Sequence, residues 1–246
     1  MNLAAPTPAG LAVWHVIRRW TAWHPEWWSL AISLGAWFFL LIPHWPYGGE
    51  PVCAACLARL DWTAGMFGWL VMVLAMMLPL MIFPLRVTAF GSLWCRRHLA
   101  IASLLAGYLC IWLMAGVAYL LLKAILQKLD ATDFRWVTTA AFFVAAGWQL
   151  TGLKRRFSVA CHRVRPLAPV GWPAHRDCLC FGAKLGIDCI GNCGLLMLAA
   201  MLSPLHQIMM VAATVLLLYE RYCVQPKYRG IALVICFMGV LHLIWD

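Results

Sequence analysis

Charged residues are scarce in this chain. Of its 246 residues, 11% are charged and only nine are Asp or Glu, whereas 64% are hydrophobic. A soluble domain is roughly half apolar, and about a quarter of its residues are charged. The composition therefore excludes an ordinary soluble domain and is typical of a polytopic membrane protein.

Several common functional signatures are missing from the sequence. We find no nucleophile–base arrangement and no Gly-rich phosphate-binding loop, and Leu57 follows Cys53-Ala-Ala-Cys56 where haem attachment requires a His. No cleavable signal peptide is recognisable, because about 26 residues without a small-residue cleavage site precede the first apolar segment. The sequence therefore shows no recognisable catalytic centre and does not favour an enzyme.

The net charge of +10 has an explanation in the membrane. Membrane proteins concentrate Lys and Arg in their cytoplasmic loops, so this excess does not indicate nucleic-acid binding. The fifteen Trp residues fit anchoring at the membrane surface. We therefore expect the lipid bilayer, and not nucleic acid, as the partner of the surface.

Seven apolar segments approach the length of about 20 residues that a helix needs to cross a bilayer. They are residues 27–43, 64–83, 100–122, 135–153, 181–203, 205–219 and 230–245. The last two are short, and the break at Ser203-Pro204 is tight, so a re-entrant hairpin is an alternative to two crossings. We predict an all-α bundle of six or seven transmembrane helices, forming one domain over 27–246. Residues 1–26 would form an amphipathic or flexible cytoplasmic segment.

Loop charges predict the orientation of the bundle. Most of the 19 Lys and Arg residues fall in loops on one side, including the run from Lys154 to Arg176. The positive-inside rule places that side in the cytoplasm. We expect a protein of the bacterial cytoplasmic membrane, with its N-terminus in the cytoplasm and its C-terminus outside.

The fifth apolar segment, residues 181–203, carries unusual polar and sulfur-containing side chains. Positions four apart lie on nearly the same face of a helix, so Asp188 and Asn192 form a polar pair. A ladder of four sulfurs runs beside that pair: Cys189, Cys193, Met197 and Met201. An ionisable residue at membrane depth marks a functional site, and thiolate and thioether ligands suit Cu(I). The alternative is that the Cys and Met side chains only fill the apolar core.

The second apolar segment offers further thioethers. Met72 and Met76 form one pair four residues apart, and Met77 and Met81 form another, with Pro79 between them. A Pro inside a membrane helix kinks it and frees a carbonyl. Met72 and Met76 are candidate ligands if this segment faces the fifth one, and are otherwise packing residues.

Two loops carry cysteines. Cys53 and Cys56 lie in the first exterior loop, where they would capture metal or form a disulfide. The long cytoplasmic loop holds Cys161, His162, His175, Cys178 and Cys180. The Cys-x-Cys spacing of Cys178 and Cys180 is unusual for zinc and fits monovalent copper better.

Two charged sequences have simpler interpretations. Lys154-Arg155-Arg156 is expected to be an anchor on the cytoplasmic side of the membrane. Glu220 is expected to form a surface pair with Arg221, or to pair with Lys184 or a bound cation if it lies inside the membrane.

Three sequences, in this order along the chain, resemble a bacterial family of predicted metal-binding integral membrane proteins. They are GWLVMVLAMMLP, GWQLTGLKRR and GIDCIGNCGLLML, and the resemblance covers roughly residues 64–221. The family's last motif is Gly-x-x-Cys-x-Gly-Cys-Cys-Trp, followed by a Met-rich run and a later Glu-Lys. The matching positions are Gly186, Cys189, Gly191, Cys193, Met197 and Glu220. The sequence departs from the family at Leu185, Asn192, Gly194 and Arg221, and the resemblance implies a metal role for the cysteines that remain, with Asp188 compensating for a lost ligand.

These observations favour a membrane protein that binds, translocates or delivers copper through the Cys and Met face of the fifth segment. The other partners expected are further membrane subunits or a metallochaperone. One alternative is a membrane thiol oxidoreductase that uses the paired cysteines. Against it, side chains four apart on a helix have Cβ atoms about 5–6 Å apart, and a disulfide needs about 3.8 Å. The other alternative is an accessory subunit whose sulfur atoms only pack.

Overall fold

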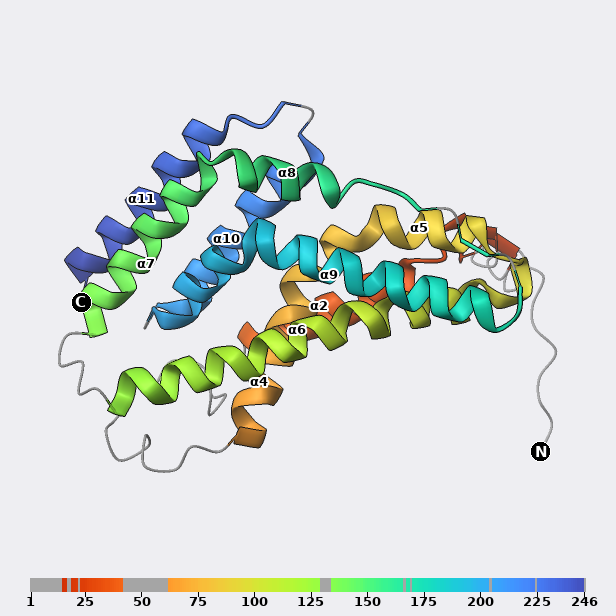
Figure 1. Cartoon of the computed structure of the whole chain (residues 1–246), viewed down its shortest axis with the longest axis horizontal. Helices are drawn as coiled ribbons and strands as arrows, with labels where there is room; N and C mark the ends of the chain where they lie inside the picture. Colours follow the sequence, from red (N-terminus) through yellow and green to blue (C-terminus); the bar gives the residue numbers. More distant parts are fainter. Residues whose placement is uncertain are drawn as a thin grey trace.

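The structure is a computed structural model that describes residues 15–16, 19–21, 23–41, 62–128, 134–165, 167–168, 170–203, 205–223 and 225–245. Within these ranges every regular element is a helix, which confirms the predicted all-α class (Figure 1). The elements are α2 (Trp27–Leu41), α4 (Trp62–Met77), η1 (Pro79–Met81), α5 (Ile82–Gly91), η2 (Trp94–Arg96), α6 (Arg97–Lys128), α7 (Phe134–Gln149), α8 (Gly152–Ala160), α9 (Gly171–Leu202), α10 (His206–Tyr222) and α11 (Tyr228–Trp245).

Helix α9 lies at the centre of the molecule and packs against α6, α7, α8 and α10. Its closest neighbour is α6, which runs parallel to it (Figure 1). Glycines make this close approach possible, because a Cβ on Gly107 would lie 2.1 Å from the Leu179 carbonyl oxygen, and one on Gly182 would lie 1.9 Å from the Leu104 carbonyl oxygen. Small residues that let two backbones approach closely are typical of helix pairs in membranes.

A proline bends the chain between α4 and α5. The two helices meet at an angle of 45° across the short η1 helix, which begins at Pro79. Because Pro79 has no N–H group, the Ala75 carbonyl loses its helical donor, and the Ser33 hydroxyl of α2 donates to it instead at 2.8 Å. The Tyr222 hydroxyl of α10 donates to the Pro79 carbonyl at 2.8 Å. The predicted kink is therefore present, and two neighbouring helices satisfy its carbonyls.

Fewer helices are long enough to span a membrane than we predicted. Helices lie in all seven apolar segments, but among the described residues only Trp94–Ile125 and Gly171–Leu202 are long and apolar enough individually. The bent α4–α5 pair makes a third if it counts as one span. The helices described in the other predicted spans have 15 to 18 residues. At about 1.5 Å per residue, these are shorter than a hydrocarbon core of about 30 Å. The described helices therefore give two to three candidate spans, and the count of six or seven stays a prediction.

The loop predicted between the fourth and fifth apolar segments is partly helical. Helix α9 begins at Gly171, about ten residues before the apolar segment that we expected, and therefore includes part of that loop. Gly171 has a φ of +80°, which favours glycine, and Pro173 in the first turn is compatible with a helix start. The sequence of this segment resembles a polar loop because the first turns of the helix carry His175, Arg176 and Asp177.

Part of the predicted organisation falls outside the described residues. Cys53, Cys56 and the whole of their loop lie there, as does most of the segment 1–26. Metal capture or a disulfide at these two cysteines stays a prediction.

Candidate copper site

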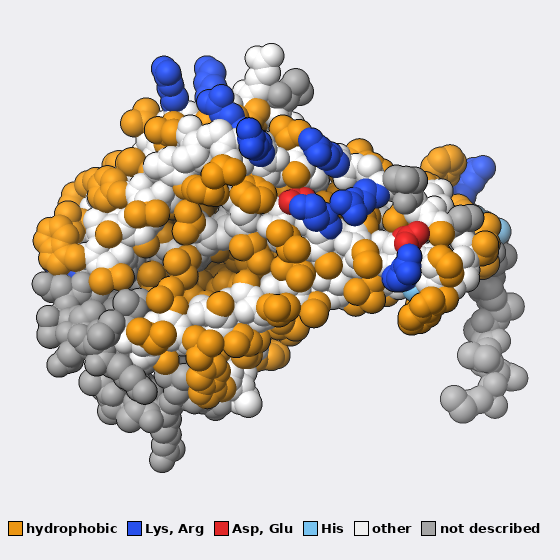
Figure 2. Space-filling model, in the orientation of Figure 1, with side chains coloured by type: hydrophobic (Ala, Val, Ile, Leu, Met, Phe, Trp, Pro, Cys, Tyr) orange, Lys and Arg blue, Asp and Glu red, His pale blue; other side chains and the backbone are white. Residues whose placement is uncertain are grey.

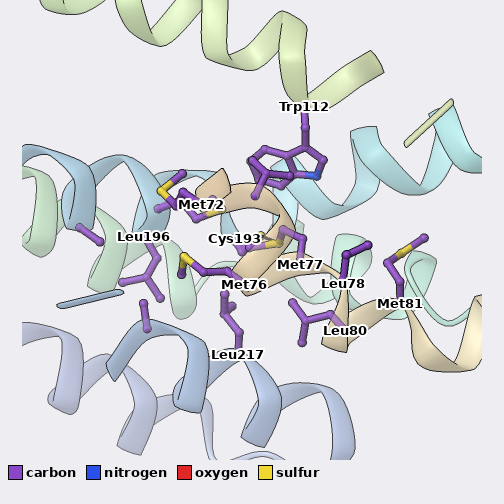
Figure 3. Close-up of a cluster of buried hydrophobic side chains, with 14 of the residues drawn as sticks. Met72, Met76, Met77, Leu78, Leu80, Met81, Trp112, Cys193, Leu196 and Leu217 are labelled. Atoms are coloured by element: carbon purple, nitrogen blue, oxygen red, sulfur yellow. Dashed lines mark hydrogen bonds between the residues drawn. The ribbon is translucent and has the colours of Figure 1, made fainter. Parts of the chain in front are cut away.

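Three sulfur atoms from two helices lie in contact at the centre of the molecule. The Cys189 and Cys193 Sγ atoms, one turn apart on α9, are 3.6 Å apart. The Met77 Sδ atom at the end of α4 lies 3.7 Å from the Cys189 Sγ and 3.9 Å from the Cys193 Sγ. Figure 3 shows Met77 beside Cys193 within the buried core. We call Met77, Cys189 and Cys193 the sulfur triangle.

The size of the triangle fits a metal ion. A point at its centre lies about 2.2 Å from each sulfur, and a metal–thiolate bond is about 2.3 Å long. Two thiols and one thioether form a soft ligand set, which selects Cu(I) over harder cations. No group of three or more His, Cys, Asp or Glu side chains in the described ranges is placed to hold a metal. A site on α9 therefore depends on methionine for its third ligand.

The bend after α4 positions Met77. Met77 is the last residue of α4, and Pro79 ends the regular helix two residues later. Met77 is fully buried and Cys193 is 1% exposed, so packing fixes both side chains.

Hydrogen bonds orient the two thiols. The Tyr108 hydroxyl of α6 donates to the Cys189 Sγ at 3.2 Å. The Cys193 thiol donates to the Cys189 carbonyl, one turn earlier, at 3.0 Å. Tyr108 is fully buried against α9, so the hydroxyl is available to stabilise a thiolate on Cys189 when a metal displaces its proton.

Asp188 has a partner on its own helix. The Lys184 Nζ atom donates to the Asp188 Oδ1 atom at 2.6 Å, one turn away. The Asp188 side chain is 5% exposed, whereas that of Lys184 is 45% exposed. The carboxylate at this depth therefore has a counter-ion that reaches the surface.

Asn192 belongs to a second ionic group, and not to a pair with Asp188. Its Oδ1 atom accepts a hydrogen bond from the Lys154 Nζ atom at 2.7 Å, and the same Nζ atom forms a salt bridge with Glu220. The side chains of Lys154 and Glu220 are 0% and 2% exposed. We call Lys154, Asn192 and Glu220 the buried triad. It joins α8, α9 and α10 next to the sulfur triangle.

The buried triad corrects two predictions. Arg155 and Arg156 are exposed as expected of an anchor, but Lys154 is wholly buried. Thr151 caps α8 by accepting from the Lys154 backbone N–H, and the helix turns this one residue of the basic run inward. Glu220 is buried too and does not pair with Arg221, which donates to the Cys161 carbonyl instead.

A pocket lies beside the triangle, between α8, α9 and α10. Twelve residues line it: Leu80, Met81, Tyr108, Ser158, Cys161, His162, Leu185, Cys189, Asn192, Leu217, Glu220 and Arg221. It thus reaches from exposed His162 to the Cys189 thiol and brings together Cys161, Asn192 and Glu220. Burial, and then the nearby Cys189, raise the pKa of the Cys161 thiol, so it carries its proton at neutral pH.

A comparison with protein families gives a match over residues 66–245, to the family described as PpoB2, copper chaperone. The chain belongs to the PpoB2 copper chaperone family. No curated protein and no solved structure matches the chain. Membership of this family supports copper as the metal concerned. The matched residues cover nearly all of the region in which the sequence resembles the predicted metal-binding membrane proteins.

The other methionines predicted as ligands lie in or against the same core as the sulfur triangle. Met72, Met76 and Met197 are buried in the same core as Cys193, and Met201 packs against that core. Figure 3 shows Met72 and Met76 near Cys193. A ligand role for these four methionines stays a prediction.

The predicted cytoplasmic set does not converge on one point. Cys161 and His162 follow α8, whereas His175, Cys178 and Cys180 lie in α9. Because residues two apart on a helix do not face each other, Cys178 is buried and Cys180 is exposed. The Cys-x-Cys spacing would allow a shared site in a loop, but in a helix it directs the two thiols to different sides.

Sequence reasoning missed Met77 as a ligand and Lys154 as a buried charge. A signal existed for Met77, since it comes just before a helix-breaking proline and forms one of the Met pairs four residues apart. This signal was not decisive, because four methionines lie close to Pro79 in the same apolar segment: Met72, Met76, Met77 and Met81. No comparable signal marked Lys154, which stands in a run of three basic residues.

Proposed function

We propose that this protein is an integral membrane copper chaperone that binds Cu(I) as cargo on the sulfur triangle of Met77, Cys189 and Cys193. The observation that carries the proposal is the contact of three soft sulfur atoms, from two helices, at 3.6 to 3.9 Å. The family match supports copper as the cargo. Binding would replace the two thiol protons by the ion, which makes the uptake of copper weaken at low pH.

The membrane setting is part of the proposal. Among the described residues, α6 and α9 are the two helices that are individually long enough to cross a membrane. They run parallel, and Arg96, Arg97 and Arg176 lie near their N-terminal ends. Figure 2 shows Lys and Arg side chains at the top of the view and from its middle toward the right, with hydrophobic side chains spread over much of the remaining described surface. By the positive-inside rule, we infer that both helices start on the cytoplasmic side, with the N-terminus inside and the C-terminus outside.

The triangle can be tested by one matched pair of variants. Met77→Leu removes a thioether at nearly constant volume, and Met76→Leu does the same at the neighbouring, equally buried position. We expect Met77→Leu to weaken Cu(I) binding at least tenfold and Met76→Leu to leave it unchanged. The measurement is competition with a chromophoric Cu(I) chelator, using purified protein in detergent.

Two results would contradict the triangle. Equal losses in both variants would move the site to the predicted Met72 and Met76 face. Copper bound by the wild type without sulfur ligands in its X-ray absorption spectrum would exclude the triangle altogether. A wild-type protein that binds no copper would favour the accessory subunit, whose sulfur atoms only pack.

A further inference from the structure

The pocket beside the sulfur triangle connects it with the surface. Its lining includes exposed His162, buried Cys161 and Cys189, which belongs to the triangle. The Arg221 guanidinium donates to the Cys161 carbonyl at 2.9 Å, which holds this stretch of chain against α10. The lining of the pocket therefore contains two soft ligands, Cys161 and Cys189.

One residue of the pocket lining carries an unsatisfied carboxylate oxygen. Glu220 lines the pocket and is 4% exposed. Its Oε1 atom pairs with Lys154, but its Oε2 atom is buried and has no hydrogen-bond partner among the described residues. An unpaired buried oxygen of this kind is costly, and a cation in the pocket would satisfy it.

We propose that the pocket is the path by which Cu(I) reaches the sulfur triangle, and that Cys161 is a transfer ligand on this path. The inference rests on the proposed function of the triangle. The ion stays Cu(I) throughout, so no oxidant or reductant is needed. The Cys161 thiol gives its proton to the thiolate of the carrier from which the copper–sulfur bond breaks. When the ion moves on, the bond to Cys161 breaks as one to Cys189 forms, and the Cys189 proton returns to Cys161. As the bond to Cys193 forms, the Cys193 proton leaves to water through the pocket.

The polar lining favours this path over one through the apolar core. Moving a bare cation between Met and Leu side chains would take it out of reach of any oxygen. The pocket offers the side chains of Glu220 and Asn192 together with Cys161 and Cys189, which compensate for the cationic Arg221 in the same lining. A transfer ligand must bind and release quickly, so its loss slows loading without changing the affinity of the final site.

Two substitutions of nearly equal volume separate chemistry from packing. Cys161→Leu adds bulk without sulfur, and Cys161→Met adds the same bulk with a soft thioether. Cys236→Leu, in α11 and away from the pocket, controls for enlarging a cysteine elsewhere in the core. The experiment measures the rate of Cu(I) transfer from a chromophoric Cu(I) chelate to the full-length protein in detergent by stopped flow. It also measures the equilibrium affinity of each variant by chelator competition.

We expect Cys161→Leu to load at least tenfold more slowly than the wild type, with unchanged equilibrium affinity. We expect Cys161→Met to regain most of the rate, and Cys236→Leu to behave like the wild type. Wild-type loading in Cys161→Leu would overturn the path, and a Met variant as slow as the Leu variant would overturn the role of the sulfur. Absence of copper binding in the wild type would instead overturn the proposed function, so the two failures are distinguishable.

Discussion

Two buried carboxylates near the sulfur triangle are neutralised by lysines in opposite ways. Asp188 takes Lys184 from the next turn of its own helix, and that lysine is 45% exposed. Glu220 takes Lys154 from a different helix, and that lysine is 0% exposed. The first pair is local in sequence and reaches the surface of the protein, whereas the second exists only because three helices meet.

The difference between the pairs lies in what each lysine would lose if its partner were absent. Lys184 lies at the surface of the protein and could turn away from the core, and exposed ion pairs contribute only about 0–1 kcal/mol. Lys154 has no such escape, because α8, α9 and α10 enclose it. Removal of one partner from a buried pair costs about 3–5 kcal/mol, since an uncompensated charge is left behind. The buried triad therefore holds the helices around the pocket in register, and the Asp188–Lys184 pair does not.

The largest expected effect is that of Lys154→Met. It leaves Glu220 without a counter-ion and the Asn192 Oδ1 atom without its donor, so we expect a loss of about 3–5 kcal/mol in the free energy of unfolding. Denaturant unfolding in detergent, followed by circular dichroism, would measure it. Lys184→Met is the matched control and should cost about 1 kcal/mol or less. Equal losses in the two variants would contradict the comparison.

Next in size is the effect of neutralising the carboxylates. Glu220→Gln keeps an acceptor for Lys154 but leaves a buried cation without a counter-charge, so we expect a loss of about 2–4 kcal/mol. Asp188→Asn leaves Lys184 free to turn to solvent and should cost less than about 1 kcal/mol. The same unfolding measurement applies to both. A larger loss in Asp188→Asn than in Glu220→Gln would show that Lys184 is confined as tightly as Lys154.

The same contrast explains what the sequence could predict. Helical periodicity placed Cys189 and Cys193 on one face, and it also places Lys184 one turn from Asp188. Long apolar runs predicted the helices, and Pro79 predicted the bend. These features depend on residues a few positions apart, which is the range over which a helix repeats.

Helical periodicity and apolar runs could not predict which residues of different helices are in contact. The choice of Met77 over Met72 or Met76 depends on which side of α4 meets the two thiols of α9, and only the packing of the helices decides that. Lys154 pairs with Glu220 across 66 positions of the chain, and nothing in the run Lys154-Arg155-Arg156 distinguishes its first member. The number of spans stays a prediction, because apolar segments were counted by composition, whereas a crossing also depends on helix length.

The smallest expected effect is the response to salt. Mobile ions screen charges that reach water, with a Debye length of about 10 Å at 0.1 M and about 3 Å at 1 M. Raising the salt concentration should therefore shrink the difference in unfolding free energy between the wild type and Lys184→Met toward zero, a change of a few tenths of a kcal/mol. The difference between the wild type and Lys154→Met should stay constant, because no ions reach a side chain that is wholly buried.

The measurement is a set of unfolding curves for the three proteins at 0.05 M and 1 M salt. Because the comparison is between differences, any general effect of salt on the detergent or on apolar burial cancels. A salt-dependent loss in Lys154→Met would mean that water enters the pocket as far as Lys154, and the buried triad would then be an ordinary solvated ion pair.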